Sequence, residues 1–115
     1  SEQDHYYVRI GNLVNIYGNL RTDSSVSGSG ALYMTGLPFD PSSGLTNMHW
    51  TGMCVGDNGW STNCEGKGIF STVPFNTNKM QWYKGSGNTA SNIDISSDIG
   101  PNANLFYNVS YRTTY

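Results

Sequence analysis

The stretch YYVRIGNLVNIYGNL, residues 6–20, alternates in character from one residue to the next. Successive side chains of an extended strand point to opposite faces of a sheet, so this alternation predicts a strand with two different faces. The apolar face carries Val14, Ile16 and Leu20, and the polar and aromatic face carries Asn15, Tyr17 and Asn19. Such a pattern is typical of a β-strand and not of an amphipathic helix.

A shorter alternating run precedes this strand and consists of Tyr6, Val8 and Ile10. Gly11 and Asn12 separate the two runs, and both residue types tolerate the positive φ angles that tight hairpin turns require. The chain is therefore expected to open with a β-hairpin. Gly18 lies inside the second strand, where a glycine often marks a bulge or a close approach of the backbone.

Length and composition limit the possible functions. The chain has 115 residues, which fits one domain, residues 1–115, with a hydrophobic core. Only 12% of the residues are charged and the net charge is −2, so Ser, Thr, Asn and Gly are expected to cover the surface. The six Lys and Arg residues are scattered singly, which argues against nucleic acid as a partner. No apolar run is long enough to cross a bilayer, so no membrane insertion is expected.

Further short strands are separated by turn residues, and together with the hairpin they predict about eight strands. They are expected within residues 31–36, 48–55, 68–73, 78–85, 91–96 and 105–115. Two prolines in LPFDPSSG, residues 37–44, predict a turn, because proline cannot donate a ladder hydrogen bond. The resulting fold class is an all-β domain, and eight antiparallel strands suit a two-sheet jelly-roll β-sandwich.

The two cysteines, Cys54 and Cys64, leave two alternatives open. They could close a small disulfide-bonded loop, or they could remain reduced and pack as small apolar residues. A zinc site would need two further ligands, and neither His5 nor His49 stands in a recognisable ligand spacing. The sequence therefore predicts no bound metal and no cofactor.

Catalytic signatures are weak. The only carboxylate pairs close in sequence are Asp57 with Glu65 and Asp94 with Asp98, and both pairs are explained more simply as turn-forming and solvating residues. The chain contains no G-x-S-x-G segment, and the DNG at Asp57 lacks the later acidic ligands of a calcium loop. The sequence therefore predicts that the chain is not an enzyme.

Three segments resemble the C-terminal domain of bacteriophage tail fibres and tailspikes. RIGNLVNIYG, residues 9–18, matches a family pattern R-I-G-N-x-V-x-I-x-G, and GALYMTGLPF, residues 30–39, matches G-x-L-x-x-x-G-L-P-F. Near the carboxyl terminus, YRT at residues 111–113 matches the Y-x-T pattern of the last strand. Residues 48–99 match poorly, and this is the region in which such domains vary with the host.

The resemblance implies a β-sandwich at the tip of a homotrimeric fibre in a virion, as the C-terminal domain of a longer fibre protein. Each subunit of a trimer must offer apolar surface beyond its own core. Aromatic and apolar residues on the faces opposite the inferred core faces are candidate trimer contacts: Tyr7, Leu13, Tyr17 and Phe106. Alternatively, some of these residues form an ordinary core with the second sheet.

A saccharide site needs a flat aromatic side chain beneath the sugar ring and polar groups at its edge. The loop of residues 56–68 offers such a set, Trp60 with Asp57, Asn58 and Asn63. Neighbouring strands could add Trp50, Tyr83 and Lys84. In the alternative interpretation, Trp50 and Trp82 fill the core.

Three functions follow from this reading. The first is a receptor-binding module that recognises a bacterial surface saccharide, such as lipopolysaccharide or capsule. The second is a purely structural tip that trimerises the fibre and helps it fold. The third is a fragment of a tailspike depolymerase.

Overall fold

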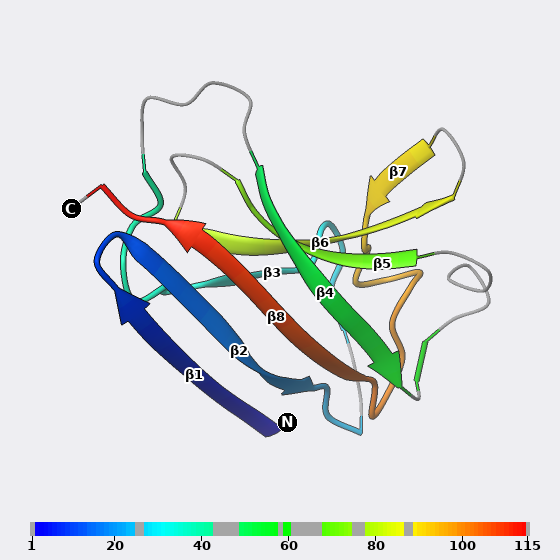
Figure 1. Cartoon of the computed structure of the whole chain (residues 1–115). Helices are drawn as coiled ribbons and strands as arrows, with labels where there is room; N and C mark the ends of the chain where they lie inside the picture. The colour runs from blue at the N-terminus through cyan, green and yellow to red at the C-terminus, as the bar shows by residue number, and fades with distance from the viewer. Residues whose placement is uncertain are drawn as a thin grey trace.

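The computed structural model of the chain describes residues 2–24, 27–42, 49–57, 59–60, 68–74, 78–86 and 89–114. These residues form eight strands: β1 (Glu2–Ile10), β2 (Leu13–Arg21), β3 (Tyr33–Thr35), β4 (His49–Asp57), β5 (Gly68–Pro74), β6 (Lys79–Ser86), β7 (Thr89–Asn92) and β8 (Asn104–Arg112). The prediction of an all-β domain is confirmed for the described residues (Figure 1). None of these residues belongs to a helix long and apolar enough to cross a membrane.

All strand pairs are antiparallel and follow one continuous path, β1-β2-β8-β4-β5-β6-β3, with β7 paired to β6. The sheet folds over on itself and forms two layers, each made of antiparallel strands. Strands β1, β2, β8 and β4 lie side by side in the first layer, and β5, β6 and β3 cross behind them (Figure 1). Strands β1 and β3 are the two ends of the path, and each therefore has one edge without a partner strand on this path.

The predicted hairpin is confirmed. Gly11 has a φ angle of 57°, and the two-residue turn places Ile10 directly opposite Leu13. The predicted apolar face of β2 is also confirmed, because Val14 and Ile16 are buried. At Gly18 the register continues without interruption, so the strand has no bulge there.

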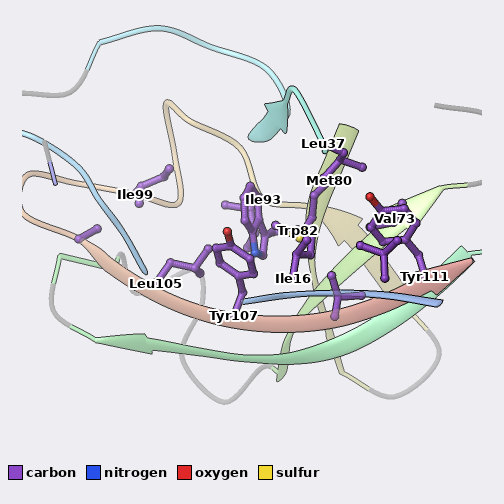
Figure 2. Close-up of a cluster of buried hydrophobic side chains, with 13 residues drawn as sticks. Ile16, Leu37, Val73, Met80, Trp82, Ile93, Ile99, Leu105, Tyr107 and Tyr111 are labelled. Carbon is purple, nitrogen blue, oxygen red and sulfur yellow. The ribbon is translucent and has the colours of Figure 1, made fainter. Parts of the chain in front are cut away.

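The core lies between the two layers. Figure 2 shows Ile16, Leu105 and Tyr107 beside the ribbons of β2 and β8, with Met80 and Trp82 of β6 facing them. The Trp82 side chain is fully buried, and its ring meets the Tyr107 ring edge to face with 6.0 Å between centroids. The last predicted strand is present as β8, and its buried residues alternate: Leu105, Tyr107, Val109 and Tyr111.

Loop residues complete this core. Leu37 is buried in the predicted turn after β3, where the Tyr111 hydroxyl donates a 2.7 Å hydrogen bond to the Phe39 carbonyl. Ile93 is buried as well, although it follows β7 instead of lying within a strand. Both segments therefore contribute side chains to the core.

We expect Gly18→Ala to destabilise the domain. A Cβ atom at this position would lie 2.3 Å from the backbone oxygen of Asp4, so β1 would have to move away from β2. Forcing an extra methyl group into a packed position costs on the order of 1–3 kcal/mol. Urea unfolding checks the prediction, with Thr51→Ala on an exposed strand position as the control. An unchanged free energy of unfolding for Gly18→Ala would contradict this close approach.

Candidate functional site

Large apolar side chains stay exposed on the outward side of the first layer. We call this set the outer apolar face, and it consists of Tyr6, Val8, Ile10, Leu13, Tyr17, Val55 and Phe106. The strand register brings them together, because Ile10 lies opposite Leu13 and Val55 lies opposite Phe106. The Tyr6 and Tyr17 rings stack with 5.6 Å between their centroids. Contiguous apolar surface of this kind marks an interaction site more often than an isolated exposed residue does.

A short polar ladder lies within this face and satisfies its own hydrogen bonds. The Asn15 side-chain amide donates to Asn108 Oδ1 at 2.7 Å and to Ser110 Oγ at 3.0 Å. These residues come from β2 and β8, which are neighbours in the first layer. Because these amide and hydroxyl groups are already paired with one another, a neighbouring subunit would cover them at a smaller cost than it would cover unpaired polar groups.

Three of the four predicted trimer contacts, Leu13, Tyr17 and Phe106, lie on the outer apolar face. The placement of the fourth was wrong, since Tyr7 pairs with the buried Ile16 and faces the inner side of the sheet. The two-residue turn explains this result, because it puts Ile10 on the same face as Leu13 and opposite to Val14. Tyr7 nevertheless remains 54% exposed, since β1 is an edge strand.

Trp60, the central residue of the predicted saccharide loop, packs onto the domain. Its side chain is half-buried against the core, and its Nε1–H donates a 2.9 Å hydrogen bond to the Asn104 carbonyl. The indole also lies so close to Gly56 that a Cβ atom there would be 2.6 Å from Nε1. Asn58 and Asn63 lie outside the described residues, and only the backbone of Asp57 is described.

We expect Trp60→Ala to destabilise the domain by about 2–4 kcal/mol, because it removes packing against the core and a hydrogen bond. Trp60→Phe keeps most of the apolar contact and should lose less stability. Thermal or urea unfolding of the two variants measures the difference. If Trp60→Ala unfolded like the unsubstituted chain, the indole would not contribute to the stability of the fold. The predicted role in ligand binding would then be the better explanation for this residue.

The other predicted ligand residues do not converge on one site. Trp50 is half-buried and packs against the core. Tyr83 lies on the outward side of β6, in a hollow of about 290 Å³ that is lined by His49, Thr51, Phe70, Thr72, Tyr83 and Ala90. Within this hollow, His49 Nδ1 and Thr72 Oγ1 are 3.1 Å apart. Phe70 of β5 pairs with residue 53 of β4, which belongs to the first layer, and with Tyr83 of β6. The hollow therefore adjoins the outer apolar face.

Lys84 is engaged in an ion pair inside the domain. Its Nζ lies 2.5 Å from Asp98 Oδ1, and Asp98 is fully buried. The second carboxylate oxygen of Asp98 accepts a 2.7 Å hydrogen bond from the Asp94 backbone N–H. Lys84 therefore holds a buried carboxylate in place, and its ammonium group is not presented to a ligand.

The carboxylates Asp94 and Asp98 have separate roles. Asp94 Oδ1 accepts hydrogen bonds from the backbone N–H and the hydroxyl of Ser96, at 2.8 and 2.6 Å, and these bonds lower the Asp94 pKa. This agrees with the turn-forming role predicted for Asp94. Asp98 also takes part in this turn, since its carboxylate accepts the Asp94 backbone N–H. The solvating part of the prediction was wrong for Asp98, because this residue is buried and paired with Lys84.

A groove that sequence reasoning missed lies between the two edge strands. It has a volume of about 320 Å³, and residues of β1, β3 and the turn after β3 form its walls. We call it the edge groove, and its lining includes His5, Tyr7, Ile16, Met34, Thr35, Leu37 and Tyr107. His5 Nδ1 forms a hydrogen bond with the Tyr107 hydroxyl inside it. Because His5 and Tyr107 are 102 positions apart, no local pattern could have brought them together.

Burial sets the protonation of this pair. It lowers the pKa of His5, although the nearby charge of Asp4 acts in the opposite direction. Burial also raises the pKa of Tyr107 to about 12. Near neutral pH the edge groove therefore holds a phenol and an imidazole that are both uncharged.

Cys54 has a free thiol and packs against the core. Burial raises the pKa of this thiol to about 12, so it is unreactive near neutral pH. Cys64, its partner in the possible disulfide, lies outside the described residues. Within the described part of the chain, no three His, Cys, Asp or Glu side chains gather as metal ligands would.

No protein-family model, no curated protein and no solved structure matches this chain significantly.

Proposed function

We propose that this chain is the host-recognition tip of a bacteriophage tail fibre or tailspike. In this proposal it belongs to the distal part of the virion and assembles as a homotrimer of jelly-roll-like β-sandwiches. It binds a bacterial surface saccharide, lipopolysaccharide or capsule, and it stabilises the fibre. It carries out no catalysis and binds no nucleic acid.

The outer apolar face is the observation that carries the proposal. Leaving Ile10 at 75% exposure and Phe106 at 45% is unfavourable in water, and a neighbouring subunit that covered them would gain on the order of 25 cal/mol per Å² of apolar surface. The face is built from β1, β2, β4 and β8, and the first, second and last of these strands include parts of two segments that resemble fibre tips. Assembly through this face would cover Tyr6, which borders the edge groove, but it would leave the inner side of β1, with His5 and Tyr7, open to a ligand.

The purely structural alternative, a trimerisation tip without ligand binding, draws support from Trp60 and Lys84. Trp60 uses its indole N–H within the domain, and Lys84 pairs with the buried Asp98. Two of the residues predicted to bind saccharide thus have structural roles. The depolymerase alternative draws no comparable support, because Asp94 and Asp98 serve a turn and an ion pair.

Three measurements separate these functions: binding to saccharides, trimerisation and release of reducing ends. The intact chain is applied to an array of purified lipopolysaccharides and capsular polysaccharides from a panel of bacteria, and binding to any of them favours receptor recognition. Trimerisation with no binding across the array would favour the structural tip. Release of new reducing ends from a bound polysaccharide would instead favour the depolymerase.

A further inference from the structure

The edge groove has the shape of a small-molecule site. Its volume of about 320 Å³ lies at the lower end of the range of about 300–1,000 Å³ that is usual for ligand pockets. Because β1 and β3 are the ends of the strand path, no strand of that path runs between them and fills the space. The floor is made of core residues, including Ile16 and Leu37, which fix its depth.

One aromatic ring in this groove is held in place before any ligand arrives. The Tyr7 ring is 54% exposed and meets the Phe39 ring edge to face, with 5.7 Å between centroids. Phe39 is itself fixed, because the Arg9 guanidinium lies 4.4 Å from its ring centroid and its carbonyl accepts the Tyr111 hydroxyl. A preordered aromatic platform loses little conformational entropy when a flat ligand stacks on it.

The polar groups of the groove are few and uncharged near neutral pH. They include the paired His5 ring and Tyr107 hydroxyl. Thr35 also borders the groove, but its side chain lies on the same outward face of β3 as Tyr33. Among the described residues that line the groove, none is Lys, Arg, Asp or Glu. An anionic ligand would therefore meet no cation in the lining, whereas a neutral ligand with several hydroxyls would find both hydrogen-bonding groups and an aromatic surface.

We infer that the edge groove binds a neutral saccharide ring. The apolar C–H face of the sugar stacks on Tyr7, and its hydroxyls bond to the His5–Tyr107 pair. This inference rests on the proposed recognition of a bacterial saccharide and moves the binding site from the loop around Trp60 to the groove. The hollow around Tyr83 is the less suitable site, because it adjoins the outer apolar face that assembly would cover.

Binding of the unsubstituted chain and three variants to the polysaccharide array tests the inference. Tyr7→Ala removes the platform at an exposed position, and Tyr107→Phe removes the hydroxyl but keeps the buried ring. Each should weaken binding to a neutral polysaccharide by about fivefold to tenfold. Tyr33→Ala is the matched control, because Tyr33 is equally exposed, 54%, but points to the outward side of β3.

The outcomes separate the site from the function. Weaker binding by Tyr7→Ala and Tyr107→Phe, with unchanged binding by Tyr33→Ala, supports the groove. If the unsubstituted chain binds and both groove variants bind equally well, the groove is overturned while saccharide recognition stands. A preference for acidic polysaccharides would overturn the neutral ligand. If the chain binds no saccharide on the array, the proposed recognition fails together with this inference.

Discussion

Tyr17→Asp is expected to dissociate the proposed trimer while leaving the protomer folded. Tyr17 lies within the outer apolar face and is 39% exposed, so the fold of a single chain depends little on its side chain. Its register neighbours, Tyr6 and Asn108, carry no charge that could pair with a carboxylate. Each interface would then bury an unpaired carboxylate, and the dissociation constant should rise by at least about a hundredfold.

Sedimentation of Tyr17→Asp over a range of concentrations measures this change. Tyr33→Asp is the matched control, because it places the same charge at an exposed tyrosine outside the outer apolar face. We expect Tyr33→Asp to assemble like the unsubstituted chain, and circular dichroism should show that both variants are folded. If Tyr17→Asp remained fully trimeric, Tyr17 would not lie in the subunit interface.

Asp98→Ala is expected to cause the largest loss of stability in the protomer. The substitution removes the partner of Lys84, whose side chain is only 13% exposed, and it leaves the Asp94 backbone N–H without its 2.7 Å acceptor. Removing one partner of a buried ion pair usually costs about 3–5 kcal/mol, because the remaining charge stays buried without compensation. The free energy of unfolding in urea measures the loss.

A double variant separates the charge effect from the packing effect. Lys84→Met combined with Asp98→Leu replaces both partners by apolar side chains of similar length, and such replacements are often close to neutral. We therefore expect the double variant to be more stable than Asp98→Ala alone. Equal destabilisation of both would indicate that the hydrogen bond to the Asp94 N–H, and not the ion pair, carries the stabilising contribution.

The sequence predicted the parts of the fold that depend on local alternation. The buried face of β2 was correct because this strand has one face in the core, which gives a period of two. The wrong placement of Tyr7 could have been avoided. A two-residue turn fixes Ile10 opposite Leu13, so the exposed face of β2 continues onto β1.

The remaining features depend on contacts between distant residues. Trp60 donates to Asn104, which lies 44 positions away, and Lys84 pairs with Asp98, which lies 14 positions away. The position of β8 between β2 and β4 likewise joins the end of the chain to its beginning. A loop tryptophan or a strand lysine has the same local pattern whether it faces solvent or packs onto such a partner, so the sequence did not distinguish the two cases.

The mass of the isolated chain in solution tests the proposed assembly most directly. Sedimentation equilibrium or light scattering at tens of micromolar should give about three times the chain mass of 12.6 kDa, since three subunits together cover the outer apolar face. A single species with the mass of one chain would show that this face remains exposed in solution, and it would contradict the proposed homotrimer.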